Sequence, residues 1–475
     1  MAIIWNGSWG GKSDTRFSGI AGSFAECIGV DGHSCPGILK AHQKLALDSA
    51  ATVTEFCKIS VACSNGYTFW FSATSGKIWA RAAAGTWTLA YTTAAAAGTH
   101  QCLGAMEKDG YIYWATQSRL HRVTVAGADD SWAAGAVSLD WKTFDITDTE
   151  FHPMEIQYSL DGEQLFIGDG NQIAAVSNAG VFSSNVLDLK DPFRVKSLMK
   201  FDIDLLIGTY VADTVNKTEI IRWDTISPSW NTSDPIEESG INSFVRDDNY
   251  VYVNAGRAGN MYYYDGQYLK LFKKIPGEYT NAKYGEVYPG STANFNGIPI
   301  FGFSNGAGNP APQGIYSLGA YTRDYRKVID LSYPISQDKV ASVEIGAVLV
   351  AGFDIFVAWK EGANYGVDKI DYSNKYESAY VETMMLEQKK RDIIKTLADV
   401  AAYYNSLPDS TGVVFSYSIN GADYVDMVPI TNSKINKIYS HLTVPSIGSL
   451  QIKMTFDVLG NDSPTIEAIG VELEE

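Results

Sequence analysis

Acidic residues stand in close pairs at several points of the chain, and paired carboxylates are the groups that hydrolyse glycosidic bonds. One carboxyl group protonates the leaving oxygen, while the other attacks the sugar or activates a water molecule. The pairs are Asp202 with Asp204, Glu237 with Glu238, and Asp247 with Asp248. All of them lie in stretches that favour turns, where acidic side chains bond their own backbone. We therefore interpret them as turn residues and predict no catalytic residue and no enzyme.

Candidate metal ligands are few and poorly spaced. Cys27, His33 and Cys35 lack the close cysteine pair and the fourth ligand of a structural zinc site, and Cys57 and Cys63 are not spaced as a zinc knuckle. The stretch "GDGNQ" at 168–172 has the composition of a calcium loop, but it is too short for an EF-hand. We interpret it as a turn, and we predict no metal and no cofactor.

The stretch "SATSGKIW", from Ser72 to Trp79, resembles the Asp-box of sialidases, Ser-x-Asp-x-Gly-x-Thr-Trp. It departs from that pattern at Thr74 and Ile78. In that family the box braces a hairpin, so the resemblance implies a hairpin here and no active site. Several aromatic residues could bind sugar, but we predict that they form a core, which is their commoner role. These are Trp70, Trp79, Trp114, Tyr262, Tyr263 and Tyr264.

Composition narrows the function classes. The chain has 475 residues and a net charge of −17, which argues against binding to a nucleic-acid backbone. The opening "MAIIWNGSWGGKSD" turns polar at once, and no apolar run is long enough to span a membrane, so we expect neither a secretory leader nor a membrane span. The five cysteines are an odd and sparse set, which suits reduced thiols in a cytoplasm.

A turn followed by a strand recurs along most of the chain. Turns rich in Asn, Asp and Gly precede the strands, because a tight reversal needs a positive φ or a side chain that bonds its own backbone. A second short strand follows most of the first ones, as in "GKIWAR" and "SRLHRV". The predicted first strands start at Tyr67, Tyr111, Leu165, Leu205, Tyr250, Ile298 and Ile355.

Repeating units of about 40 to 50 residues with up to four strands are typical of a β-propeller. A single unit cannot bury both of its faces, so the units stack around an axis. We predict an all-β chain with a propeller of about seven blades over 57–378, while six or eight blades remain compatible with the divergent repeats.

The two ends of the chain have a different character. Residues 379–475 contain a hairpin signal at Asn420-Gly421 and alternating apolar residues, which predict a C-terminal β-sandwich. The segment from Asp392 to Tyr403 also fits a helix, but its strand neighbours favour a strand. Residues 1–56 are rich in Gly and Ser, and we expect an extended N-terminal arm that packs on the sandwich or on a neighbouring subunit.

These stretches together resemble a family of propeller-containing virion proteins of tailed bacteriophages. The resemblance rests on repeat segments such as "SNGYTFWFSATSGKIW", "DGYIYWATQSRLHRV" and "DLLIGTYVADTVNKTEIIRW", and on "VVFSYSINGADY" near the end. It spans nearly the whole chain, but its motifs are structural, so they indicate a scaffold and specify no chemistry.

The resemblance implies a structural component of the virion. We expect a tail or nozzle protein that forms an oligomeric ring at the portal-tail end, made in the host bacterial cytoplasm. Its expected partners are copies of itself and neighbouring tail and portal proteins. One alternative is a receptor- or carbohydrate-binding virion protein, for which we would inspect the loop from Phe303 to Gly314 and expect a host-surface glycan as partner. A glycoside hydrolase is the third alternative.

Overall fold

A computed structural model describes most of the chain, and within the described residues it contains no α-helix. A single 3₁₀ turn covers Val125–Gly127, and all other regular structure is strand. The prediction of an all-β chain is therefore confirmed. The described residues are 2–6, 23–93, 101–148, 150–211, 216–248, 250–275, 285–304, 313–320, 327–336, 343–387, 396–404, 407–431, 437–444 and 449–474.

The chain divides into two compact units, and each unit is discontinuous in sequence. Unit 1 combines 1–46, 314–336 and 370–475, while unit 2 combines 47–313 and 337–369. Unit 2 is thus inserted into unit 1. The predicted domain limits after residues 56 and 378 stay predictions.

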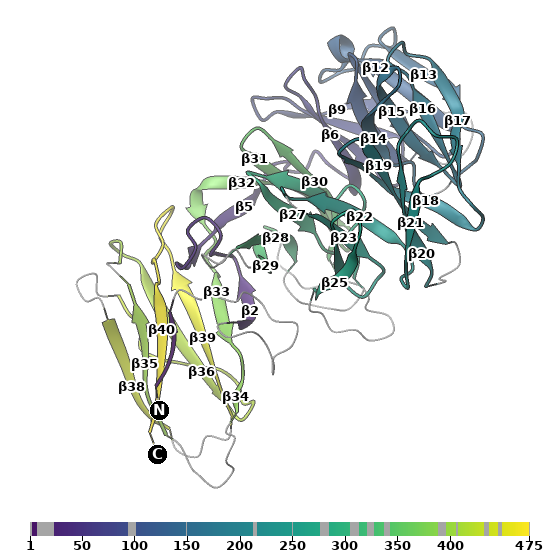
Figure 1. The fold of residues 1–475 in the computed structure, drawn as a ribbon. Coiled ribbons are helices and arrows are strands. Elements are labelled where there is room, and N and C mark those ends of the chain that lie inside the picture. The colour runs from purple at the N-terminus through teal and green to yellow at the C-terminus, as the bar shows by residue number, and fades with distance from the viewer. Residues whose placement is uncertain are drawn as a thin grey trace. The chain divides into compact units, whose positions relative to one another are not determined.

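Unit 2 is a β-propeller, as predicted. Five of its sheets each consist of four consecutive antiparallel strands, and a sixth sheet has the order β30-β31-β32-β5 (Figure 1). The five consecutive sheets are β6 (Cys57–Ala62) to β9 (Trp87–Thr92), β10 (Gly104–Lys108) to β13 (Val137–Thr143), β14 (Met154–Ser159) to β17 (Phe182–Asp188), β18 (Phe193–Phe201) to β21 (Thr232–Ile236), and β22 (Ile241–Arg246) to β25 (Leu269–Lys274). The sixth contains β30 (Val343–Ala351), β31 (Asp354–Glu361), β32 (Asn364–Lys375) and β5 (Gln43–Leu47).

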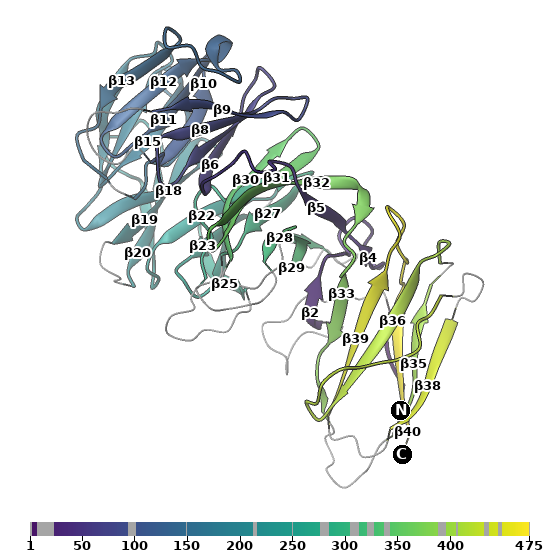
Figure 2. The same cartoon turned by 180° about the vertical axis from the view of Figure 1, so that it is seen from behind.

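The first strand of each blade faces the axis, and these inner strands contact one another in sequence around the ring (Figure 2). β6, β10, β14, β18 and β22 are neighbours in that order, and β30 contacts β6 and closes the ring. The strand pair β26 (Thr292–Phe295) and β27 (Ile298–Gly302) lies between β22 and β30. Six four-stranded blades are therefore complete in the part of the chain that the structure describes, and the predicted count of seven stays a prediction.

The Asn, Asp and Gly residues that predicted tight turns adopt the backbone conformation that such turns need. Asp109 and Gly110 both have positive φ, 49° and 78°, and they join β10 to β11 (Tyr111–Ala115). Asn296 and Gly297 do the same between β26 and β27, with φ of 52° and 80°. Two consecutive positive φ values define the hairpin turn whose twist matches the twist of the flanking strands, which is why Asn, Asp and Gly recur there.

A small residue occupies the end, or nearly the end, of the second strand of each repeat. Where this residue is a glycine, it lies against the inner strand of the next blade. A Cβ on Gly168 would lie 2.6 Å from Cγ1 of Val195, and one on Gly302 would overlap Ile345. Contacts this close exclude a larger side chain and let the sheets converge on the axis. The residues are Ser72, Ala115, Gly168, Gly208, Ala255, Gly302 and Ala358.

The aromatic residues of the repeats fill the space between blades. Trp70, Trp79, Trp114 and Tyr264 are at most 1% exposed, so the prediction that they form a core is confirmed for these four residues. Trp114 contacts Trp132, with ring centroids 5.5 Å apart. Tyr262 and Tyr263 are only partly buried.

Residues that precede the first blade close the last one. The backbone N–H of Asp48 donates to the carbonyl of Val367 at 2.9 Å, and the N–H of Val367 donates to the hydroxyl of Ser49 at 3.0 Å. The carboxylate of Asp48 then accepts hydrogen bonds from Nε of Arg81 at 2.6 Å and from the indole of Trp87 at 2.7 Å. Asp48 thus joins the first and last blades of the ring. We call Asp48, Ser49, Arg81 and Val367 the closure site.

Unit 1 consists of two main sheets that share one core. The first has the order β1-β40-β35-β38, and the second contains β2, β33, β39, β36 and β37 in that order. Val400 and Val471 of the first sheet belong to the same buried cluster as Phe415 and Met454 of the second. The strands are β1 (Ala2–Asn6), β40 (Ala468–Glu474), β35 (Thr396–Tyr403) and β38 (Lys437–Val444) in the first sheet, and β2 (Phe24–Ile28), β33 (Tyr380–Thr383), β39 (Ser449–Asp457), β36 (Gly412–Ile419) and β37 (Val425–Asp426) in the second.

Two sequence predictions for this unit are confirmed. Residues 396–403 form a strand and no helix, and residues 392–395 lie outside the described residues. β36 pairs with β37 in an antiparallel hairpin, and Asn420 and Gly421 have positive φ in the loop between them.

Candidate functional site

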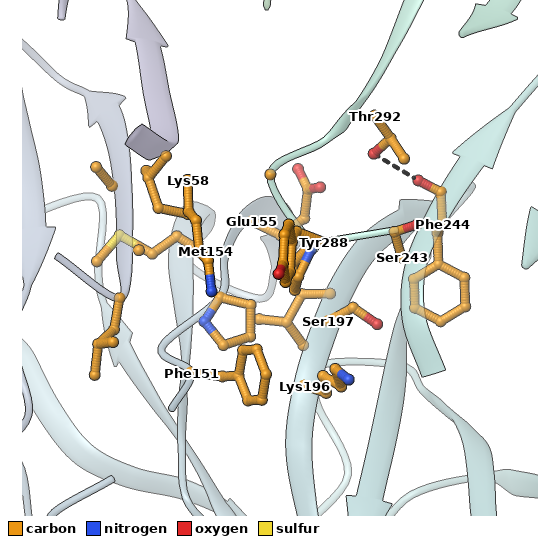
Figure 3. Close-up of a pocket in the computed structure, with 18 of the residues that line it drawn as sticks. Lys58, Phe151, Met154, Glu155, Lys196, Ser197, Ser243, Phe244, Tyr288 and Thr292 are labelled. Carbon is orange, nitrogen blue, oxygen red and sulfur yellow. Dashed lines mark hydrogen bonds between the residues drawn. The ribbon is translucent and has the colours of Figure 1, made fainter. Parts of the chain in front are cut away.

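A cavity of about 710 Å³ lies among the inner strands of the propeller. Its walls come from β6, β10, β14, β18, β22 and β26 and from the segments just before several of these strands. Lys58 and Lys196 from two inner strands, and Phe151 and Tyr288 from segments before two others, lie around this cavity (Figure 3). The volume lies within the range of small-molecule sites.

Two lysines from well-separated blades project into this cavity. The ammonium group of Lys58 lies 4.1 Å from the centre of the Tyr288 ring, and that of Lys196 lies 5.0 Å from the centre of the Phe151 ring. Lys196 also donates a hydrogen bond to Oδ1 of Asn242 at 2.7 Å. Burial lowers the pKa of both lysines, and nearby Glu286 opposes that shift in each case.

Three carboxylates share the walls with these lysines. Glu286 lies 3.9 Å from Nε of Arg257, and Glu150 contributes to the field at both lysines. Glu155 is the second residue of β14 and also lines the cavity. Burial raises the pKa of Glu155 to about 7, although the N–H groups of Ile156 and Lys200 donate to its carboxylate. The site can therefore offer cations, hydrogen-bond acceptors and aromatic edges to one small polar molecule.

Replacing Glu155 by glutamine is expected to stabilise unit 2 by about 2 kcal/mol at pH 8 and to change little at pH 5. The folded pKa of about 7 lies above the usual value of 4.5, so ionised Glu155 costs free energy in the folded state at high pH. That cost is complete above pH 7 and declines as the pH falls from 7 toward 4.5. Urea unfolding followed by tryptophan fluorescence at both pH values measures the difference, and an equal effect at pH 5 and pH 8 would contradict this explanation.

The carboxylate pairs singled out in the sequence do not line the cavity. Asp204 is buried and forms an ion pair with Arg222, while Asp202 forms one with Arg246 at 2.9 Å. Asp247 accepts the N–H of Tyr250 at 2.8 Å and the hydroxyl of Tyr252 at 3.1 Å. Glu238 accepts bonds from Asn260 and Tyr262. These acids therefore stabilise single blades or, in the case of Asp202, join two adjacent blades.

The stretch that resembles an Asp-box forms a braced hairpin. Ser72 Oγ accepts the N–H groups of Thr74 and Ser75 at 3.0 and 2.9 Å. The carboxylate of Glu55 then accepts the hydroxyls of all three residues and the ammonium of Lys77. Burial opposes ionisation, but these bonds outweigh it and lower the pKa of Glu55 to about 2. The carboxylate expected within the box is thus supplied from outside it.

The candidate metal ligands named in the sequence do not form a metal site in the described part of the chain. Cys27 is buried in the core of unit 1, Cys35 is exposed, and all five cysteines are free thiols. Among the described residues no group of three His, Cys, Asp or Glu side chains is arranged to hold a metal ion. The stretch 168–172 forms the turn between β15 (Gly162–Asp169) and β16 (Gln172–Val176), where Asp169 accepts the side chain of Gln172 at 3.0 Å.

Two further sequence expectations concern surfaces. No helix in the part of the chain that the structure describes is long and apolar enough to cross a membrane. In the loop from Phe303 to Gly314, residues 305–312 lie outside the described residues, so its role as a binding loop stays a prediction.

Comparisons with known proteins give distant likenesses only. No protein-family model matches the chain, and no curated protein matches it. Among solved structures, the extracellular domain of BT4673 from B. thetaiotaomicron shares 13% identity at a TM-score of 0.45, covering 84% of this chain and 48% of that one. This chain therefore spans about half the length of that protein.

Two other solved structures match most of their own length. A streptogramin B lyase shares 9% identity at a TM-score of 0.45, covering 69% of this chain and 97% of that one. An exo-β-1,3-galactanase from Phanerochaete chrysosporium shares 12% identity at a TM-score of 0.28, with coverages of 69% and 98%. At these TM-scores none of the likenesses bears on what this chain does.

Proposed function

We propose that this chain is a structural component of a tailed-bacteriophage virion, a tail or nozzle protein that assembles into a ring at the portal-tail end. The observation that carries the proposal is the order of the two units along the chain. β1 pairs with β40, so both ends of the described chain belong to unit 1, and the propeller is an insertion. One unit can therefore serve assembly while the other is displayed. The resemblance of the repeats to phage virion proteins supports the same role.

Unit 1 also has strand edges that suit assembly. In the described residues β1 and β38 are the outer strands of their sheet, and each has one edge without a partner strand. Such edges bind further strands through their main-chain N–H and C=O groups. We propose that neighbouring copies meet through unit 1.

The proposal includes a seventh blade, a C-terminal sandwich and an N-terminal arm. The pair β26–β27 would be the inner half of a seventh blade, because it lies between β22 and β30 and carries the same small residue, Gly302, as the complete blades. The shared core of unit 1 supports a C-terminal β-sandwich. The first strands would be the N-terminal arm that packs on it.

The mass of the purified protein in solution, measured with particle images of the same sample, tests the proposal. We expect a ring of defined copy number, or a monomer that forms rings only on tail assemblies. Removing residues 1–6 should weaken the ring and leave the propeller folded, because the closure site begins at Asp48. A chain that stays monomeric with and without tail proteins would overturn the structural role.

A second candidate function, binding of a host-surface glycan, is favoured by the axial cavity. Charged side chains and aromatic rings together are suited to a polar organic ligand. We propose binding without turnover. A pKa near 7 would suit Glu155 as a general acid, so the test includes release of reducing ends from the glycan. Release that disappears in the Glu155→Gln variant would replace binding by hydrolysis.

A further inference from the structure

The lining of the axial cavity contrasts in charge with the whole chain. The chain has 37 Lys and Arg against 54 Asp and Glu, whereas the lining includes the cations Lys58, Lys196, Arg246 and Arg257. The acids in the lining are Glu150, Glu155 and Glu286. The lining thus has four cations and three acids, whereas acids outnumber cations in the whole chain, so an anion meets less repulsion in the cavity than over the rest of the protein.

The ammonium group of Lys58 is the most available group of the site. Among the described residues it forms no hydrogen bond and no ion pair, and its recorded contacts are with the rings of Tyr288 and Phe56. An ammonium group carries three donors, and a half-buried one gains free energy when an acceptor satisfies them. A ligand oxygen within the cavity would supply that acceptor.

Lys196 provides a second cation from another blade. One of its three donors is used by Asn242, which leaves two donors and holds the side chain in place. Both lysines line the same cavity, and the charge of Lys58 makes a small contribution, beside the larger effect of burial, to the lowered pKa of Lys196. An anion between them would relieve this repulsion, and a carboxylate has two oxygens, one for each lysine.

The acids of the same lining restrict the rest of the ligand. The carboxylate of Glu150 accepts no hydrogen bond among the described residues, and Glu286 is only 3.9 Å from its nearest cation. Within the described part of the chain, neither carboxylate has a donor at hydrogen-bond distance. Hydroxyl groups on the ligand would supply donors, whereas a bare inorganic anion would face them with like charge.

We propose that the axial cavity binds a small hydroxylated carboxylate. Lys58 and Lys196 hold the carboxylate, and Glu150 and Glu286 accept the hydroxyl groups. This chemistry is shared by the acidic sugars of surface polysaccharides and by free hydroxy acids. The proposal is independent of ring assembly, because every residue involved lies in unit 2.

Calorimetric titration of the full chain with sodium glucuronate and sodium gluconate tests the proposal, with glucose and sulfate as controls. We expect both carboxylates to bind about tenfold or more tightly than either control. Tighter binding of glucuronate identifies an acidic sugar as the ligand, and tighter binding of gluconate identifies a free hydroxy acid. Glucose or sulfate binding as tightly as the two carboxylates would overturn the proposal, as would no binding of either carboxylate.

Variants locate the site. Lys58→Met and Lys196→Met keep the apolar stem and remove the charge, and each should weaken glucuronate or gluconate binding by about tenfold or more. Lys200→Met is the matched control, because Lys200 lies on the same strand as Lys196 with its ammonium over Tyr158 and outside the cavity lining. Unchanged affinity in both cavity variants, with melting curves like that of the parent, would place the ligand elsewhere. Lys58→Gln replaces Lys58→Met if the latter does not fold.

Discussion

Replacing Asp48 by alanine is expected to lower the free energy of unfolding of unit 2 by about 3–5 kcal/mol. The side chain of Arg81 is only 9% exposed, and its Nε lies 2.6 Å from the carboxylate of Asp48. Removing Asp48 leaves this guanidinium buried without its carboxylate and also leaves the indole of Trp87 without its acceptor. The loss is large because the charge stays in place after its partner is gone.

Urea unfolding of unit 2, followed by tryptophan fluorescence, measures this effect, and a second ion pair supplies the control. Asp202 and Arg246 are paired at 2.9 Å, but their side chains are 62% and 35% exposed. Asp202→Asn removes this charge and keeps a residue that tolerates the positive φ of 53° at this position, so it should cost less than about 1 kcal/mol. Equal losses in the two variants would show that closure of the ring does not depend on Asp48.

Lowering the pH from 7 to 5 is expected to destabilise unit 1 by about 2 kcal/mol for each of two buried histidines. Burial lowers the pKa of His33 to about 3, with a further contribution from His42, and burial lowers the pKa of His42 to about 4. Both values lie below the usual 6.5, so the unfolded chain takes up protons that the folded chain does not. Stability is complete above pH 6.5 and is lost as the pH falls toward 4.

Denaturant unfolding of unit 1 between pH 7 and pH 4.5 tests this prediction. The double variant His33→Asn with His42→Gln removes both titrating groups, so its stability should depend much less on pH in this window. Asp31 contributes only at lower pH, because its hydrogen bonds and neighbouring cations outweigh burial and hold the pKa of its carboxyl below the usual 3.8. A parent protein that is equally stable at pH 7 and pH 5 would contradict the prediction.

The local structure of the propeller was predictable because each strand and turn is specified by neighbouring residues. Asp109-Gly110 and Asn296-Gly297 need positive φ, and both adopt it. Alternating apolar and aromatic residues between such turns produced the expected strands, and Trp70 and Trp114 are buried as expected. The same short-range reasoning also separated the strand at 396–403 from a helix.

Features that join distant parts of the chain were not predictable in the same way. The arm over residues 1–56 stays a prediction, but the contact of Asp48 and Ser49 with Val367 in the last blade was not predicted. No local pattern signals that contact. Likewise, the acidic pairs are visible in the sequence because their members are at most two positions apart, whereas the cavity is built from single residues on different blades.

A weaker signal for the cavity was present in the sequence. Lys58, Glu155 and Lys196 are charged residues inside the inner strands of three repeats, each close to the start of its strand. Aligning the inner strands, in addition to the strands after each turn, would have placed these residues around one cavity. Their chemistry follows only from that alignment, since no two of them are near in sequence.

The closure site has a consequence for how the protein is made. The hydrogen bond between Ser49 and Val367 spans 318 residues, so at roughly 5–20 residues per second a ribosome needs on the order of half a minute to make its second partner. During that time the first blade has emerged from the ribosome, but the last blade that packs against it has not yet been made. Unit 1 is completed later, because β1 can pair with β40 only when residues 468–472 have been synthesised. The propeller can therefore close while unit 1 is still being synthesised, and the order of synthesis separates the two folding events.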